Sequence, residues 1–470
     1  MVKRTNRIGG LMSIRREPNR NLQDLITEAR FSRKGLARRV SELASTQGLS
    51  MGCDHTAVAR WLAGSVPRDP TPRLLAQVFS QRLGRMLTPQ DLGMDIVSED
   101  HTIGLRYPRN TERAVDTARL LWRYDVESRG FLMDSVFVAG AVSAASRDWL
   151  IGGPREDVSY TGTDGRVTMA DVRHVRALGN EFERLSHEFG AQRIRRHMIN
   201  YLHFDVAPLL KKSRTDEVGR ALLQTAAEFT AAAGYMAIDC NDLNLAERYY
   251  ILALGLAHAA DSRDYGAQVM ATHMGHLALY AQHPAEAVQL AEAARLGGRQ
   301  RGGHLALAVA WVVEARGHAR MGDGRACARA LSEAEQHFDR SSPSDDSAAY
   351  LRYFKEAYLA DAFAHCFRDL NEPAKACQYA QAALLDLPAT HMRRRSINTG
   401  ILAHADLAKN EPEAAARHGL EAVRLTRQLH SPRAFRRIAR LRKQFEPYRG
   451  LPEVAAFVEQ ADTLLAEARV

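Results

Sequence analysis

Apolar side chains recur at helical spacing along most of the chain, and the alternation typical of β-strands is almost absent after residue 168. In the first part, this spacing predicts four or five short helices between Leu22 and Leu83, interrupted by glycines and by three closely spaced prolines. Two further helices with apolar faces are expected over 109–150. The pattern therefore predicts an all-α protein.

The C-terminal part contains five copies of one spacing of small residues. In each copy, a small residue is followed by a second one 12 positions later and by an alanine 19 positions later. The sets are Gly234/Ala246/Ala253, Gly275/Ala287/Ala294, Ala315/Cys327/Ala334, Ala364/Ala376/Ala383 and Ala403/Ala415/Ala422. Antiparallel helices approach closely where their side chains are small, so each set predicts one helical hairpin of tetratricopeptide type.

A turn is expected between the first and second small residue of each set. The turn residues are Asn241, Gln282, Gly322, Asn371 and Asn410. We expect left-handed backbone there, and a following proline suits the first residue of the next helix. Because each hairpin buries its face only against its neighbours, the array is expected to form a curved α-solenoid with a concave groove, capped by helices before Gly234 and after Arg433.

Positive charge is concentrated at the N-terminal end. Residues 1–90 contain 16 Lys and Arg against 6 Asp and Glu, which leaves 48 basic and 49 acidic residues in the rest of the chain. A strongly basic module on a neutral body favours a head that binds nucleic acid. A solvated basic face is the alternative explanation.

The head contains two adjacent segments with helix-start signals. Ser32 is placed to cap the helix "RKGLARRVSELA", and Asp54 to cap "HTAVARWLAG", which ends at Gly64. In a helix-turn-helix, residues in the N-terminal half of the second helix reach base edges. The candidate base contacts are His55, Thr56 and Arg60. The candidate phosphate contacts are Ser32, Arg33 and Lys34.

The segments "SRKGLARRV", "HTAVARWLAGSVP" and "LLAQVFSQRLG" resemble the Xre-type, lambda-repressor-like helix-turn-helix. The Leu-Ala pair of that family corresponds to Leu36 and Ala37. Its S-x-x-I-x-x-W-x-x-G run corresponds to Thr56 in place of Ser, Val58 near the Ile, Trp61 and Gly64. The resemblance implies that Trp61 is a scaffold residue. The distance from Ala37 to Trp61 is longer than in that family, so "SELASTQGLSMGCD" is expected to extend the second helix and its loop.

The rest of the chain resembles the NsdA-like family of tetratricopeptide-containing actinomycete regulators, through segments such as "GYMAIDCNDLNLAERYYILAL" and "LALYAQHPAEAVQLAEAA". The resemblance implies a cytoplasmic transcriptional regulator, with repression the favoured sign. The expected organisation is a basic flexible arm (1–20), a helix-turn-helix domain (21–95), a helical connector (96–151), a linker (152–167) and the helical repeats (168–470).

The residue that follows the first small position of a tetratricopeptide hairpin tends to face the concave side. In this chain those residues are Tyr235, His276, Arg316, His365 and His404. Neutral His bonds to amides and Arg pairs with carboxylates, so this row is a candidate effector site for a peptide, a small ligand or a protein partner. The alternative is packing between repeats or plain exposure. "RRR" at 393–395 is interpreted as a solvated helix start or a second nucleic-acid contact.

The favoured function is sequence-specific binding of double-stranded DNA by a homodimer, since one small head buries too little surface for tight binding. The alternative is a protein-interaction scaffold whose head docks a protein. The sequence has no P-loop, no Rossmann glycine pattern and no C-x-x-C among its five cysteines, so we expect no enzyme, cofactor or metal. No stretch has the length and apolarity of a membrane span.

Overall fold

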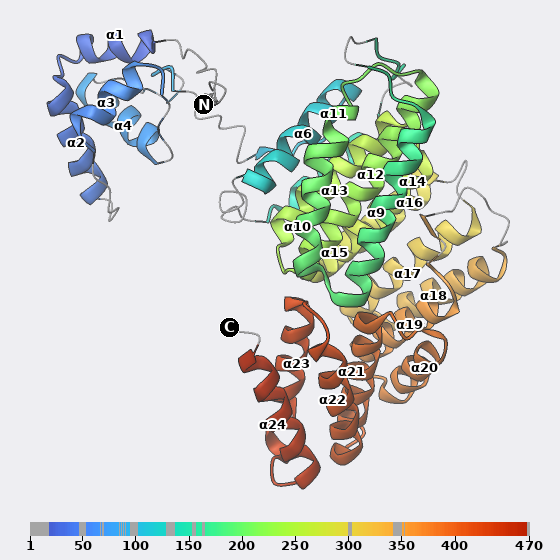
Figure 1. The fold of residues 1–470 in the computed structure, drawn as a ribbon. Helices are drawn as coiled ribbons and strands as arrows, with labels where there is room; N and C mark the ends of the chain where they lie inside the picture. The colour runs from blue at the N-terminus through green and yellow to red at the C-terminus, as the bar shows by residue number, and fades with distance from the viewer. Residues whose placement is uncertain are drawn as a thin grey trace, which may run out of the picture. The chain divides into compact units, whose positions relative to one another are not determined.

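The computed structural model describes residues 18–46, 53–65, 67, 70–83, 85, 87, 89, 91–94, 102–127, 137–152, 157–161, 165–298, 303–341, 350–351 and 353–467. The chain divides into two compact units, Met1–Asp100 and His101–Val470. Helices make up both units, and the described residues outside them form only isolated β-bridges (Figure 1). The predicted all-α class is confirmed.

The first unit contains four described helices: α1 (Arg20–Glu28), α2 (Arg33–Thr46), α3 (His55–Leu62) and α4 (Thr71–Leu83). They enclose one apolar core. Its members include Leu22, Leu36, Val40, Val58, Trp61, Leu75 and Phe79. The arm expected over 1–20 lies outside the described residues up to residue 17, and its last part starts α1, where the Asn19 side chain accepts a hydrogen bond from the Leu22 amide.

The second unit begins earlier than expected. The helices α6 (Thr111–Glu127) and α8 (Ala139–Leu150), assigned above to a connector, pack into its core, and Trp122 and Trp149 are fully buried there. Part of the expected linker is also fixed, because the Tyr160 and Val167 amides donate to backbone carbonyls of Arg214 and Ser213. Burial of Val158 and Val167 in the same core outweighs the polar, glycine-containing composition of the linker.

In the described part of the chain, α6 and α8 are followed by further helices and then by five hairpins, which are the repeats. The first two further helices are α9 (Met169–Phe189) and α10 (Ala191–Tyr201), followed by a π-helical turn, Leu202–Val206, and the short α11 (Ala207–Leu209). Thr168 and Asp171 form a capping box at the start of α9.

The hairpins run in chain order. The first pairs α12 (Asp216–Asp239) with α13 (Leu243–Ala259). In the second, the first helix consists of α14 (Arg263–Gln268), a π-helical turn (Val269–Met274) and α15 (Gly275–Tyr280), and its partner is α16 (Pro284–Gly298). The last three pair α17 (His304–Arg320) with α18 (Gly324–Asp339), α19 (Glu356–Asp369) with α20 (Pro373–Asp386), and α21 (Met392–Ala408) with α22 (Pro412–Arg427). The chain ends with α23 (Pro432–Gln444), a 3-10 turn (Glu446–Tyr448) and α24 (Pro452–Glu467).

The small-residue spacing is confirmed as the rule that builds these hairpins. All fifteen predicted small residues are buried, one on the first helix and two on the second helix of each pair. The five predicted turn residues all have positive φ, between 58° at Asn371 and 78° at Gly322. A Cβ on Gly234 would lie 2.5 Å from the ring of Tyr250, so the first hairpin packs too closely for a larger residue there.

The array does not stay open. The connection before α23 returns to the end of α9, where the His430 amide donates to the Phe189 carbonyl at 2.8 Å and the Gln192 amide donates to the His430 carbonyl at 3.1 Å. Helix α23 packs against α12, and α21 packs against α9 (Figure 1). The two ends of the repeat array, with the helices that flank them, therefore meet.

Candidate functional site

Helix α3 is held by residues on its inward side. Asp54 caps it, since its carboxylate accepts a 2.8 Å hydrogen bond from the Ala57 amide, and this bond lowers the pKa of Asp54. Val58 and Trp61 are buried in the core, which confirms Trp61 as a scaffold residue. Gly64, with φ of 91°, terminates the helix as expected.

The opposite side of α3 carries the candidate base contacts. His55, Thr56 and Arg60 are all exposed. The Thr56 hydroxyl is already used, because it donates to the Asp54 carboxylate at 2.8 Å. Among the described residues, Arg60 has no carboxylate partner. Arg60 is thus the strongest free donor on this side of α3.

The start of α2 carries the candidate phosphate contacts. Ser32 caps the helix, since its hydroxyl accepts a 3.0 Å hydrogen bond from the Gly35 amide. Arg33 and Lys34 are exposed and have no carboxylate partner among the described residues. Further along the helix, Arg38 and Arg39 both pair with Glu42. The unpaired cations are therefore at the N-terminal end.

Helices α2 and α3 pack together, and hydrogen bonds fix the beginning and end of α3. The Ser41 hydroxyl on α2 accepts a 3.1 Å hydrogen bond from the Cys53 amide just before α3, and the Leu62 carbonyl at its end accepts a 3.0 Å bond from the Asn19 amide. Helix α2 runs to Thr46, which confirms the expected extension. Residues 47–52 of the longer loop lie outside the described residues.

A comparison with family models supports this division of the chain. Residues 22–95 match the SP15 N-terminal domain. The matched range coincides with the expected head and lies within the first compact unit. No curated protein matches the chain.

The second candidate site lies on what we call the inner surface, formed by α12, α15, α17, α19 and α21 together with α23. Each of the first five helices carries one residue of the predicted row, directly after its buried small residue. The row consists of Tyr235, His276, Arg316, His365 and His404. The first four lie close enough to influence the ionisation of common neighbours. Burial and then Arg316 lower the pKa of both His276 and His365. Tyr235 raises the pKa of Tyr280 on α15, and Arg316 lowers it.

His404, on α21, contacts the end of α23. Its Nδ1 is 3.1 Å from the Gln444 amide oxygen at the end of α23. It lines a small hollow of about 160 Å³ with Arg368, Asn371 and Glu372. The structure therefore places His404 beside α23.

The dominant feature of the inner surface was missed by the sequence analysis. An arginine cluster gathers there, formed by Arg316, Arg368, Arg393, Arg394, Arg433 and Arg437. "RRR" at 393–395 supplies two members, and the expectation of a solvated helix start is wrong for Arg393, which is 4% exposed. The signal in the sequence was the repeated arginine in "PRAFRRIARLRK", whose inward members only the packing of α23 identifies.

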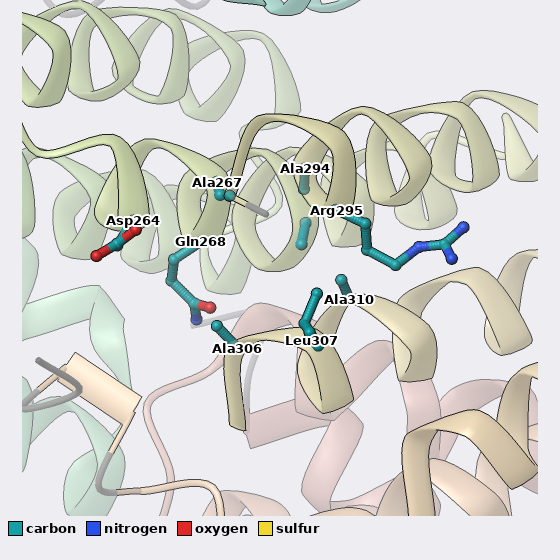
Figure 2. A pocket seen from close by; sticks show the side chains of 10 residues that line it. Asp264, Ala267, Gln268, Ala294, Arg295, Ala306, Leu307 and Ala310 are labelled. Carbon is teal, nitrogen blue, oxygen red and sulfur yellow. The ribbon is translucent and has the colours of Figure 1, made fainter. Parts of the chain in front are cut away.

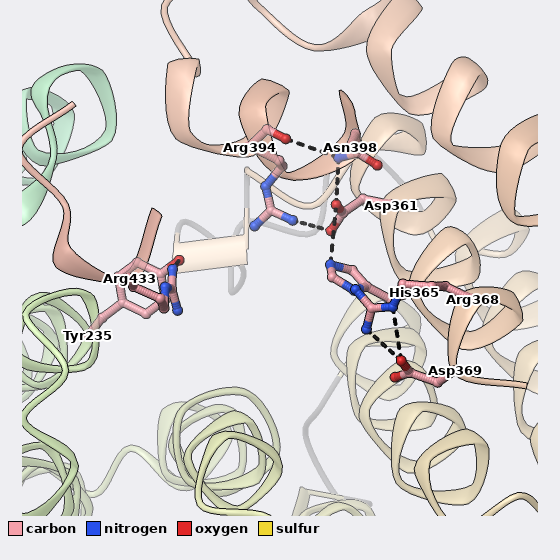
Figure 3. A network of polar contacts seen from close by, with 8 residues as sticks. All are labelled: Tyr235, Asp361, His365, Arg368, Asp369, Arg394, Asn398 and Arg433. Carbon is pink, nitrogen blue, oxygen red and sulfur yellow. Dashed lines mark hydrogen bonds and ion pairs between the residues drawn. The ribbon is translucent and has the colours of Figure 1, made fainter. Parts of the chain in front are cut away.

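Three aspartates neutralise part of this cluster. Asp239 lies 3.5 Å from both Arg393 and Arg433. Asp361 pairs with Arg394 and accepts a 2.7 Å hydrogen bond from Asn398, and Asp369 pairs with Arg368 (Figure 3). In Figure 3, Tyr235 and Arg433 lie together, and Arg394 lies between them and the group formed by His365 and Arg368.

The cluster changes the ionisation of its neighbours. Burial acts to raise the pKa of Tyr235, but Arg393, Arg433 and Arg394 together lower it to about 7. Burial, and then Arg316 and Arg368, lower the pKa of His365, so its imidazole is neutral at neutral pH. The surface therefore presents positive charge together with neutral hydrogen-bonding groups.

A further hollow of about 300 Å³ lies between α14, α16 and α17 (Figure 2). Alanines line much of it. Its main polar groups are occupied, because Arg295 pairs with Glu314 and Gln268 donates to the Tyr353 hydroxyl at 3.1 Å. The hollow therefore offers a ligand mainly apolar contacts with its alanine side chains.

Two searches of the described residues gave negative results. Within the part of the chain that the structure describes, no group of three or more His, Cys, Asp or Glu is placed to hold a metal ion. Likewise, no described helix is long and apolar enough to cross a membrane.

Proposed function

We propose that the first unit binds double-stranded DNA and that the protein is a sequence-specific transcriptional regulator, more specifically a repressor. The observation that carries the proposal is the division of α3 between Trp61, buried in the core, and the adjacent Arg60, exposed and unpaired among the described residues. An arginine fixed on a rigid helix is the side chain best suited to read guanine in the major groove.

Charge and helix ends support the same function. The unpaired Arg33 and Lys34 lie near the N-terminal end of α2, next to the capping residue Ser32. Backbone amides and cations at a helix N-terminus are suited to phosphate oxygens. In this proposal α2 holds the DNA backbone while His55, Thr56 and Arg60 approach the bases. The Thr56 hydroxyl must then exchange its bond to Asp54 for one to the DNA.

The remaining parts of the proposal concern the whole chain. We infer a homodimer that places two heads on two half-sites, acting in the cytoplasm, with the second unit as the part that dimerises or responds to a signal. A small module of this kind contacts one half-site, and two are needed for physiological affinity.

Genome-wide DNA pull-down tests the proposal directly. Wild type is expected to enrich a defined set of DNA sites. Arg60→Ala is expected to lose discrimination at one base position and to lose about 1–3 kcal/mol of binding free energy at those sites. Arg325→Ala is the control, because it removes the same charge from the exposed side of α18. Identical site profiles for wild type and Arg60→Ala would contradict base reading by this residue.

Salt dependence separates DNA binding from the alternative, a head that docks a protein. Binding through several phosphate contacts must weaken steeply as salt rises, and Lys34→Ala should lower the salt slope by about 1. Measured by fluorescence anisotropy on an enriched site, a flat salt response would contradict DNA binding and favour the scaffold.

A further inference from the structure

The arginine cluster is only partly neutralised by the protein's own side chains. Asp239, Asp361 and Asp369 pair with Arg393, Arg433, Arg394 and Arg368. Among the described residues, Arg316 and Arg437 have neither an ion pair nor a hydrogen-bond partner. Arg316 is only 7% exposed, so its charge is not solvated as a surface arginine would be.

Both arginines lie near His365 and Tyr280. Arg316 on α17 and Arg437 on α23 both lower the pKa of His365, in addition to burial. Both also lower the pKa of Tyr280, against the effect of burial. Burial lowers the pKa of Arg437, and the charges of Arg433, Arg368 and Arg316 lower it further, so like charges from α17, α19 and α23 lie near one another. A buried, unpaired charge costs free energy unless an opposite charge meets it.

We propose that this part of the inner surface binds a small molecule that carries a multiply charged phosphate group, with Arg316 and Arg437 as its main ligands. A phosphate offers several oxygens in different directions, which suits donors that converge from α17, α19, α21 and α23. A planar carboxylate offers two oxygens in one plane. The His365 Nδ1, buried and without a hydrogen-bond partner in the described part of the chain, is a further group that such a ligand would reach.

The proposal deepens the role of the second unit as the responsive part of the protein, but its test does not depend on DNA. Binding is measured by calorimetry on the full chain with inorganic pyrophosphate as the probe. Citrate at the same ionic strength is the comparison for carboxylates, and a nucleoside diphosphate is the comparison for larger phosphate ligands.

The expected result is saturable, one-to-one binding of pyrophosphate with at least fivefold preference over citrate. A nucleoside diphosphate that binds more tightly than pyrophosphate supports the proposal and assigns the ligand to nucleotides. Equal or tighter binding of citrate overturns the assignment to phosphate, and absence of saturable binding by both phosphate probes overturns the site.

Variants locate the bound probe. Arg316→Gln and Arg437→Gln are each expected to weaken pyrophosphate binding at least tenfold, and Arg325→Gln, on the exposed side of α18, by less than twofold. Arg437 is half-buried, so its variant keeps the test informative if Arg316→Gln fails to fold. Arg60→Ala must leave pyrophosphate affinity unchanged, because the basic head is the other place where an anion would bind. Loss of binding in Arg60→Ala, with Arg437→Gln unaffected, overturns the proposal and leaves DNA binding to be judged separately.

Discussion

The Asp239 carboxylate accepts a 2.8 Å hydrogen bond from the Ser431 hydroxyl, although 192 residues separate the two. Asp239 is fully buried at the end of α12, and its second oxygen accepts a 3.1 Å bond from the Ala191 amide. Arg393 and Arg433 approach it at 3.5 Å. One side chain therefore joins four helices at the point where the repeat array closes.

Asp239→Asn is expected to lower the free energy of unfolding by about 3–5 kcal/mol, because it leaves two buried arginines without their charge partner. Urea denaturation measures the loss. Asp386→Asn is the matched control on an exposed position of α20, expected to change stability by less than about 0.5 kcal/mol. A loss below about 1 kcal/mol for Asp239→Asn would contradict the closing role of Asp239.

The ionisation of Asp239 predicts how the stability of the protein depends on pH. Burial acts to raise the pKa of Asp239, but Arg393, Arg433 and the two hydrogen bonds outweigh it and lower the pKa below its ordinary value. A lowered pKa in the folded state stabilises the protein above the unfolded pKa and loses this effect as pH falls through the folded pKa. Wild type should therefore lose more stability than Asp239→Asn on acidification below about pH 4. Parallel acid denaturation curves would contradict this.

Two glycines on first helices should respond in opposite ways to alanine. Gly234→Ala places a Cβ 2.5 Å from the Tyr250 ring and is expected to destabilise by about 1–3 kcal/mol. A Cβ on Gly400, in α21, meets nothing within 4 Å, so Gly400→Ala should stabilise by about 0.5–1 kcal/mol. Thermal unfolding compares the two. Equal effects would show that the small-residue rule does not control hairpin packing.

Tyr235 should titrate near neutral pH. Its pKa of about 7 results from three arginines, which favour the phenolate against the effect of burial. Ultraviolet absorbance of tyrosinate is expected to rise through this pH, and to rise less in Tyr235→Phe, in which only the neighbouring Tyr280 keeps a pKa that Arg433 lowers against the effect of burial. Tyr265→Phe is the control, since burial raises the pKa of Tyr265 well above its ordinary value and its loss should leave the transition intact.

The titration of Tyr235 should also weaken pyrophosphate binding as pH rises through about 7. A phenolate at this position repels the anion and competes for the same arginines, so binding takes up a proton. The charged and titratable groups that face Tyr235 are Arg393 and Arg394 on α21, Arg433 on α23, Asp239 on α12, His187 on α9, Tyr250 on α13 and Tyr280 on α15.

The ratio of the pyrophosphate affinities of wild type and Tyr235→Phe isolates the contribution of Tyr235 ionisation, since the ionisation of pyrophosphate itself affects both proteins equally. We expect the ratio to fall by about tenfold per pH unit above the pKa. A ratio that is constant with pH would contradict coupling between Tyr235 and the bound anion.

Local features of this protein were predictable from the sequence. The turn positions Asn241, Gln282, Gly322, Asn371 and Asn410 follow from the need for positive φ, and the buried small residues follow from close helix packing. The caps Ser32 and Asp54 and the inward Trp61 follow in the same way. Each of these depends on neighbours within one or two helices.

Closure of the array was not predictable, because it depends on small rotations accumulated over five hairpins and their connections. No local pattern distinguishes Arg393, which is buried at the junction, from Arg395, which bonds to the Leu384 and Leu387 carbonyls at the end of α20. His404 shows the same limitation. The rule placed it in line with His365, but α23 and its Gln444 occupy the adjoining space.

The junction at Asp239 also constrains how this chain could have changed over time. An open solenoid gains or loses a repeat at little cost, since each added hairpin only extends the stack. Here the last hairpin must arrive opposite the first, with Ser431 and Arg433 in reach of Asp239. Duplication or deletion of one hairpin would displace that meeting point by a whole repeat. The number of repeats in this protein is therefore fixed by its geometry, and variation is confined to the connections and to the side chains that line the interior.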